Sequence, residues 1–390
     1  MCPKQSFAAP IAASLTFAAL AFAALAFAAL TFTSAPATAA PAAAPVEPAQ
    51  PFSIQDMVRM ERISEVAVAP DGKRVAYTQR STDMEANKGR TSIWLLDTAK
   101  RRAAPVPLIA GGDNANSAQW SGDGQFIYFL SNHGGSSQVW RVSVPASGAR
   151  ADAPAAAPTQ VTHLPLDVGS FRVSRTGGRI LVSLEVFLNC ADLPCTKQRL
   201  DKAAHAAATG ALFDQLFIRH WDTWRDGRLS QLFSMPLDGS GVAQGNPVNL
   251  TGGIGDVPSK PFGGREDYAF SPDSLRVVFS VRASSGEAWS TNFDIYESPA
   301  DGGALPRNLT ADNKAWDAQP AYSPDGSQLA YLAMDRPGFE ADRFHLVLLD
   351  VQSGARRPLT QNWDRSIAGF AWSSDGKTLF ATTDHLGQRP

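Results

Sequence analysis

Short runs rich in apolar residues, joined by tight polar turns, recur along this 390-residue chain after its first fifty residues. The clearest example is the stretch from Ala321 to Leu332, in which two such runs flank Pro324, Asp325 and Gly326. Proline fixes φ as the first central residue of a type I turn requires, aspartate suits the next position, and glycine tolerates the left-handed conformation that follows. The pattern therefore predicts a β-hairpin.

This hairpin pattern occurs six times. Aligned on the last turn residue, the copies lie at Gly72, Gly124, Gly177, Ser274, Gly326 and Gly376. They recur about every fifty residues, with one gap nearly twice as long, and such a period indicates a solenoid or a propeller. Most hairpins precede an apolar third strand, such as Ile93 to Leu96, and a short fourth strand. The sequence thus predicts an all-β protein, a β-propeller of about six four-stranded blades with the last incomplete. The alternative is a β-sandwich, which would not require a constant long period.

The first forty residues have a different composition. A single positive residue, Lys4, precedes an apolar run from Ile11 to Phe32, and the segment Ala37 to Ala39 offers small residues for cleavage. Residues 1–39 are therefore predicted to be a signal peptide, and residues 40–52, rich in alanine and proline, a flexible tether. We accordingly expect a periplasmic or secreted protein. Because the apolar run approaches membrane-spanning length, an uncleaved membrane anchor is the alternative.

Charge and cysteine content narrow the possible partners. The formal net charge is −2 at pH 7, and no cluster of Lys and Arg is present, which argues against nucleic acid binding. Cys190 and Cys195 would remain after removal of the signal peptide, and in an exported protein this pair predicts a disulfide. No further Cys or His lies near them at metal-ligand spacing, so neither a metal nor another cofactor is expected.

The propeller domain is expected to span residues 53–390. Ser53 followed by Asp56 resembles a capping box and predicts a short helix from Ile54 to Arg62, packed on the propeller before a first strand at Val66. The sixth repeat stops after two strands, at Pro390. An open ring would leave unpaired strand edges, so we expect the chain to be truncated.

Blade three is interrupted between its second and third strands by an insertion of about residues 188–230. The insertion contains both cysteines, a predicted helix from about Thr196 to Ala208, and the aromatic-rich segment from Phe213 to Trp224. Long ordered insertions on a rigid scaffold often carry a binding function.

These features together resemble a known family. The Pro-Asp turns, the Asn-Cys insertion and the segment from Arg219 to Asp222 are similar to the N-terminal propeller of bacterial dipeptidyl aminopeptidases and acylaminoacyl-peptidases, of the prolyl oligopeptidase family of serine peptidases. The hairpins alone are also typical of TolB-like and WD40-like propellers. The resemblance implies a propeller of seven or eight blades, of which about six are present here, and peptide substrates. It also implies a following α/β-hydrolase domain, in which a Gly-x-Ser-x-Gly turn presents the nucleophile. This chain contains no Gly-x-Ser-x-Gly, so no catalytic residue is assigned, the hydrolase domain is expected to be absent from it, and the chain alone is expected to be inactive.

The resemblance also implies that the propeller screens access to the active site and helps to bind the free amino terminus of the substrate. One branch of the family uses an adjacent Glu pair, which this chain lacks. Asp222 between Trp221 and Trp224 would instead join a carboxylate to aromatic faces that suit a cation. The other candidates in or beside the insertion are His220, Glu185 and Asp214. Alternatively, the tryptophans pack the insertion onto the blade and Asp222 pairs with Arg219 or Arg225.

Two functions follow as hypotheses. In the first, the chain is the propeller portion of a serine peptidase that releases dipeptides or acylated residues from peptide N-termini. In the second, it is a non-enzymatic TolB-like propeller of the cell envelope that binds a protein or peptide partner. The insertion favours the first hypothesis, because a plain scaffold would not need it.

Overall fold

The structure is a computed structural model that describes residues 51–109, 114–144, 157–208, 210–214, 216–261 and 263–388. The chain divides into the units Met1–Phe52 and Ser53–Pro390, and the fold below is that of the second. The predicted signal peptide and the predicted tether up to residue 50 lie outside the described residues.

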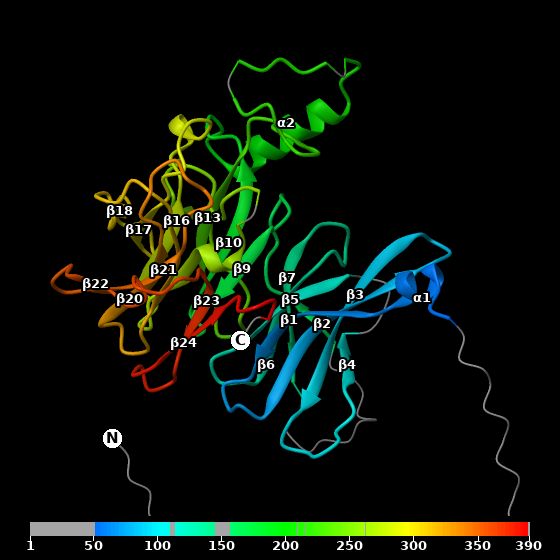
Figure 1. The fold of residues 1–390 in the computed structure, drawn as a ribbon. Coiled ribbons are helices and arrows are strands. Elements are labelled where there is room, and N and C mark those ends of the chain that lie inside the picture. Colours follow the sequence, from blue (N-terminus) through cyan, green and yellow to red (C-terminus); the bar gives the residue numbers. More distant parts are fainter. Residues whose placement is uncertain are drawn as a thin grey trace, which may run out of the picture. The chain divides into compact units, whose positions relative to one another are not determined.

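Six antiparallel sheets follow one another along the described part of the second unit and form the blades of a β-propeller (Figure 1). Blade one consists of β1 (Arg62–Val68), β2 (Arg74–Asp83), β3 (Lys88–Asp97) and β4 (Val106–Ile109). Blade two consists of β5 (Ala115–Trp120), β6 (Phe126–Ser131), β7 (Gln138–Ser143) and β8 (Thr159–Gln160). Blade three consists of β9 (Ser170–Val173), β10 (Arg179–Val186), β13 (Leu229–Pro236) and β14 (Val248–Asn249).

Blade four consists of β15 (Tyr268–Phe270), β16 (Arg276–Val281), β17 (Asp294–Pro299) and β18 (Arg307–Asn308). Blade five consists of β19 (Asp317–Tyr322), β20 (Gln328–Ala333), β21 (His345–Asp350) and β22 (Arg356–Pro358). The sixth sheet pairs β23 (Ile367–Trp372) with β24 (Leu379–Thr383). The remaining elements are the helices α1 (Ile54–Arg59) and α2 (Leu193–Ala204), the 3-10 turns η1 (Arg265–Asp267) and η2 (Ser284–Gly286), and the hairpin strands β11 (Arg219–His220) and β12 (Thr223–Trp224).

All six predicted hairpin turns are present. In the clearest copy, the Gly326 amide donates to the Ser323 carbonyl at 2.9 Å, and the Ser323 hydroxyl donates to the Asp325 carboxylate at 2.6 Å. The last turn residue has a left-handed φ in every copy, between +63° at Ser274 and +75° at Gly326. The serine and aspartate thus stabilise the turn, while glycine at the last position avoids the steric cost of that φ.

The core lies between successive blades, because the middle strands bury apolar residues on both faces. In β10, for example, Ile180 and Val182 belong to the cluster shared with blade two, whereas Leu181 belongs to the cluster shared with blade four. This is the consequence of side chains that alternate between the two faces of a strand. Trp120 and Trp372 occupy equivalent places, and each indole N–H donates to a carbonyl of the preceding blade's first strand.

The N-terminal helix differs from its prediction. The capping box is confirmed, since the Asp56 amide donates to the Ser53 hydroxyl at 3.2 Å and the Ser53 amide donates to Asp56 at 2.9 Å. However, α1 ends at Arg59, because Arg62 already pairs with Arg80 and opens β1 four residues before the expected start at Val66. Helix α1 contacts β2 of blade one, as expected, but only loosely, because none of its residues is fully buried.

In the part of the chain that the structure describes, no helix has the length and hydrophobicity of a membrane span.

Candidate functional site

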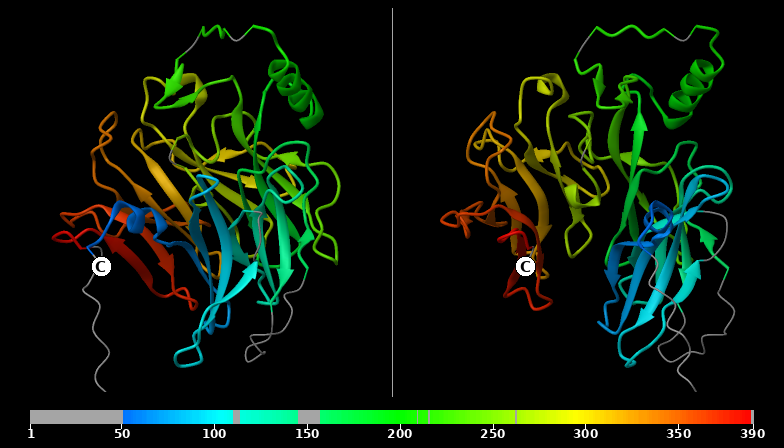
Figure 2. Two further views of the ribbon diagram at one scale, coloured as in Figure 1. Left: turned by 90° about the vertical axis from the view of Figure 1, so that its right-hand side faces the viewer. Right: turned by 45° about the vertical axis from the view of Figure 1, so that its right-hand side comes forward.

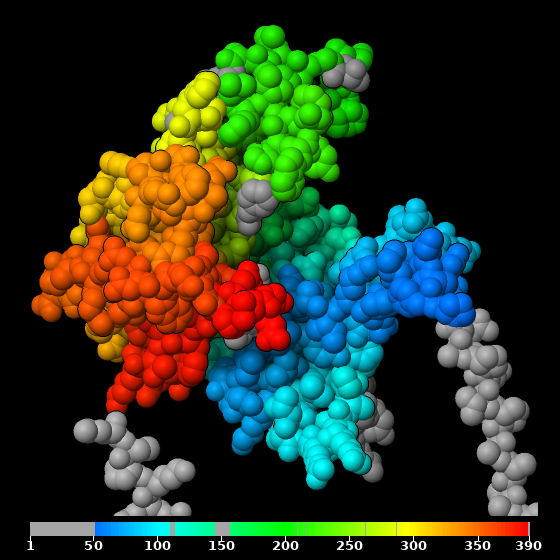
Figure 3. Space-filling view, in the orientation of Figure 1, coloured from blue at the N-terminus to red at the C-terminus, as the bar shows by residue number. Residues whose placement is uncertain are grey.

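The insertion of blade three spans residues 187–228 between β10 and β13, close to the predicted limits. It projects from one end of the sheets in both views of Figure 2 and in the space-filling view of Figure 3, where it is green. Cys190 and Cys195 form a disulfide near its base, as the sequence predicts. Helix α2 begins at Leu193 rather than Thr196, because Asp192 caps it by accepting from the Cys195 amide at 2.8 Å. It ends at Ala204, four residues before its predicted end.

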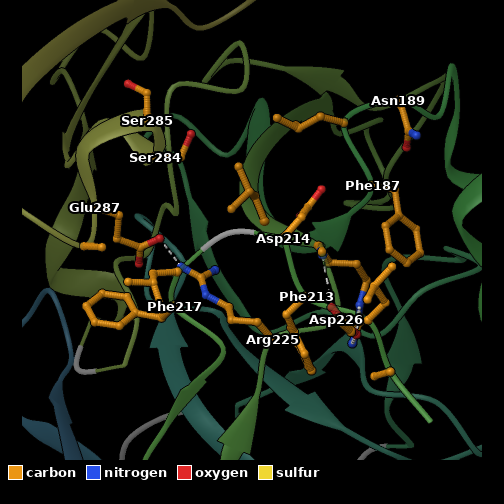
Figure 4. Close-up of a pocket in the computed structure, with 18 of the residues that line it drawn as sticks. Phe187, Asn189, Phe213, Asp214, Phe217, Arg225, Asp226, Ser284, Ser285 and Glu287 are labelled. Atoms are coloured by element: carbon orange, nitrogen blue, oxygen red, sulfur yellow. Dashed lines mark hydrogen bonds and ion pairs between the residues drawn. The ribbon is translucent and has the colours of Figure 1, made fainter. Parts of the chain in front are cut away.

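A cavity of about 1190 Å³ lies between this insertion and the connection from β16 to β17 of blade four (Figure 4). Both connections join the second and third strands of neighbouring blades, so they lie at the same end of the propeller. The insertion side of the lining includes Phe187, Leu188, Asn189, Arg199, residues 211–214, Leu216, Phe217 and residues 225–228. Residues Ser284, Ser285, Glu287, Ala288 and Trp289 line it from blade four.

Arg225 connects the two sides of this cavity. One guanidinium nitrogen lies 3.0 Å from the Asp256 carboxylate, and another bonds Glu287 (Figure 4). The second carboxylate oxygen of Glu287 lies 3.3 Å from the Arg282 guanidinium. The Arg225 side chain is only 19% exposed, so these ion pairs are largely removed from water and hold the end of the insertion against blade four.

The chain of ion pairs continues into blade three. Lys260 Nζ lies 3.8 Å from Asp256 and 2.7 Å from Glu185. The other Glu185 oxygen lies 3.2 Å from the Arg228 guanidinium, which also contacts Asp226 at 2.7 Å. Glu185, a candidate for substrate binding, therefore has two cationic partners and lies outside the cavity lining.

Asp214 differs from the other carboxylates that line this cavity in having no arginine partner among the described residues. It lines the space and is exposed to solvent (Figure 4). It makes no hydrogen bond or ion pair with another residue that the structure describes, whereas Asp226 and Glu287 are both paired with arginine. Asp214 thus presents the negative charge that is open to a cationic ligand.

The other candidates lie on the hairpin formed by β11 and β12. Trp221 and Asp222 are its turn residues, Trp224 ends it, and all three are exposed and outside the cavity lining. The Arg225 guanidinium bonds Asp256 and Glu287, and the Arg219 guanidinium lies 5.4 Å from the centre of the Trp224 ring.

This hairpin supports the wall of the cavity. The Trp224 ring lies 6.1 Å from that of Phe213, and the His220 ring lies 5.8 Å from that of Phe217, measured between ring centres. Because Phe213 and Phe217 both line the cavity, Trp224 and His220 can position the lining without reaching into it.

Sequence reasoning missed the contribution of blade four, residues 284–289. The sequence repeat could have indicated it. The aligned repeats place the connection between the second and third strands of blade four beside the insertion of blade three, at the same end of the strands. Among the described residues, no group of three or more His, Cys, Asp and Glu side chains is arranged to hold a metal ion.

No protein-family model matches the chain. Dipeptidyl-peptidase 5 of Porphyromonas gingivalis is 26% identical over 325 residues, which cover 82% of this chain and 44% of that protein. Dipeptidyl-peptidase 5 of Trichophyton equinum is 27% identical over 352 residues, which cover 85% of this chain and 46% of that protein. The chain is therefore similar to dipeptidyl-peptidase 5 over most of its own length. It spans less than half the length of these dipeptidyl-peptidase 5 proteins.

Solved structures agree on the fold. The acylaminoacyl peptidase of Pyrococcus horikoshii matches with a TM-score of 0.55 at 12% identity, over 84% of this chain and 43% of that one. An acylaminoacyl peptidase in complex with Z-Gly-Gly-Phe-chloromethyl ketone matches with a TM-score of 0.54 at 15% identity, over the same shares. The predicted resemblance to peptidase propellers is confirmed by these matches and by the dipeptidyl-peptidase 5 homologues.

Proposed function

We propose that this chain is the propeller portion of a periplasmic or secreted serine peptidase that removes dipeptides from the free amino termini of peptides. The homology to dipeptidyl-peptidase 5 supports the reaction class, and the sequence pattern of residues 1–39 supports export. The nucleophile and its partners would belong to an α/β-hydrolase domain outside this chain, with the propeller binding the substrate and limiting access to it.

The observation that carries this proposal is the cavity with Asp214 in its lining. Both the insertion and blade four contribute apolar and aromatic side chains, and ligand sites are commonly such apolar hollows with a few polar groups that fix orientation. The carboxylate of Asp214 would accept a hydrogen bond from the substrate's ammonium. A hydrogen bond to a charged group contributes about 1.5–3 kcal/mol.

This geometry favours dipeptide release over the release of acylated residues. An acylated amino terminus carries no charge, so it would gain nothing from Asp214. Asp222 with Trp221 and Trp224 is the second candidate position for the ammonium, on the hairpin that supports the cavity wall. A TolB-like scaffold has less support, because the curated homologues are peptidases.

Peptide binding to the purified chain tests the proposal without any catalytic step. Two tetrapeptides of the same sequence carry a fluorophore at the carboxyl end, one with a free and one with an acetylated amino terminus. We expect the free peptide to bind about ten- to a hundredfold more tightly by fluorescence anisotropy, as the ammonium contact implies. Equal affinities, or tighter binding of the acetylated peptide, would contradict recognition of a free terminus.

A further inference from the structure

Large apolar side chains are exposed on both sides of the cavity. Leu212 of the insertion is 97% exposed and Trp289 of blade four is 84% exposed. Leu188 and Leu216 are also among the exposed hydrophobic residues that line this space. Exposure of apolar area to water is unfavourable, and a concentration of such area in one hollow indicates a surface that another molecule covers.

The charges around the cavity identify the kind of molecule. Arg225 and Arg228 are paired with carboxylates, and Arg199 donates to the Asn189 side chain at 2.8 Å and lies over the Phe187 ring at 3.9 Å. Among the described lining residues, Asp214 is thus the carboxylate that no cation pairs with, while Arg199 keeps its positive charge beside Asn189 and Phe187. A cationic group attached to an apolar body fits Asp214 and the exposed apolar side chains beside it.

The position of Asp214 in the chain sharpens this further. Leu212 and Leu216 lie two residues before and after it, and all three line the cavity. In the first residue of a peptide, the ammonium and the side chain are attached to the same carbon atom. The Asp214 carboxylate can therefore contact the ammonium of that residue, while Leu212 and Leu216 contact its side chain.

We infer that the cavity selects peptides whose amino-terminal residue has a bulky apolar side chain, which contacts Leu212 and Leu216 on the insertion and Trp289 on blade four. This inference rests on the proposed function, in which the ammonium of the same residue binds Asp214. Trp289 and Leu212 are then specificity-determining residues contributed by neighbouring blades.

The test compares two free tetrapeptides that differ only in the first residue, Phe or Gly, with a fluorophore at the carboxyl end. We expect the Phe peptide to bind about tenfold more tightly, because burial of its side chain is favourable and ordering of the bound peptide offsets only part of that gain. Trp289→Ala and Leu212→Ser should each reduce this preference severalfold. Trp363→Ala removes a 48% exposed tryptophan that does not line the cavity, and should leave the preference unchanged.

The outcomes separate the inference from the proposed function. Equal binding of the Phe and Gly peptides, together with weaker binding of their acetylated forms, would overturn the apolar selection and leave the ammonium site intact. An unchanged Phe preference in both Trp289→Ala and Leu212→Ser would also overturn it. Failure of all peptides to bind the wild-type chain would overturn both the inference and the proposed function.

Discussion

Blades three and five share one strand plan and differ in a single connection. Strands β10 and β20 are almost entirely buried and contribute to the core on both faces. Blade five joins its second and third strands by residues 334–344, whereas blade three uses residues 187–228. In blade three the end of this connection is fixed by Arg225 and Arg228, whose partners lie in two blades. The repeat thus provides the scaffold, and long-range ion pairs hold the part that carries the cavity.

The largest effect is expected from breaking that ion-pair chain. Arg225→Ala would remove the cation that Asp256 and Glu287 share. Lys260 and Arg282 remain beside these carboxylates, so we expect a cost at the lower end of the about 3–5 kcal/mol that breaking a buried ion pair causes. Urea denaturation of the purified chain would measure the free energy of unfolding. Because the cavity wall would also lose its anchor, peptide binding should weaken.

The matched control is Arg307→Ala. Arg307 also pairs with a carboxylate, that of Glu297 at 3.1 Å, but its side chain is 69% exposed. Exposed pairs contribute about 0–1 kcal/mol, so this variant should remain close to wild type. A loss for Arg225→Ala no greater than that for Arg307→Ala would show that the insertion is held by other contacts.

Buried carboxyl groups also differ between two regions of the molecule: Asp256 and Glu287 beside the cavity pair with Arg225, whereas Asp317 of blade five has a raised pKa. Burial raises the pKa of Asp317 to about 7, and the nearby Asp294 carboxylate acts in the same direction. The folded chain therefore binds this proton more tightly than the unfolded chain does. The resulting stability is fully present below about pH 4, the usual range of the group, and is lost as the pH rises toward 7.

Asp317→Asn removes this titration. We expect the difference in unfolding free energy, wild type minus variant, to fall between pH 4 and 7 by at most about 1.4 kcal/mol per pH unit. The exposed Asp301→Asn variant serves as the control, and its curve should run parallel to that of wild type. Parallel curves for Asp317→Asn as well would contradict a raised pKa at this position.

A smaller and more local effect is expected from the disulfide. Replacing both Cys190 and Cys195 with serine removes a constraint on a short loop, for which about 1–3 kcal/mol is expected. Hydrogen exchange should accelerate in α2 and remain unchanged in the connection 334–344 of blade five. Equal acceleration in both connections would mean that the disulfide stabilises the whole propeller rather than the insertion.

Local sequence patterns predicted the scaffold well for a physical reason. The six turns depend on residues within four positions of each other, as the bond from Gly326 to Ser323 shows, and strand faces follow the period of two. The capping box at Ser53 and the disulfide depend on equally short separations.

The cavity could not be predicted in this way. Its walls come from residues such as Phe187 and Trp289, about a hundred positions apart, and Arg225 finds Glu287 only after blades three and four have packed. The two tryptophans that flank Asp222 made it a predicted cation site. The sequence could not show that Asp214 lines the cavity, whereas Asp222 lies on the hairpin behind the cavity wall.

The central claim is that the Asp214 carboxylate in the cavity binds the amino-terminal ammonium of a peptide substrate. The most direct measurement compares Asp214→Asn with Asp222→Asn, using free and acetylated forms of one tetrapeptide. Asn preserves the shape of Asp and removes the charge, so Asp214→Asn should weaken binding of the free peptide about ten- to a hundredfold and leave the acetylated peptide nearly unaffected. Asp222→Asn should change neither affinity. A selective loss for Asp222→Asn, or equal losses for both peptides in Asp214→Asn, would contradict the claim.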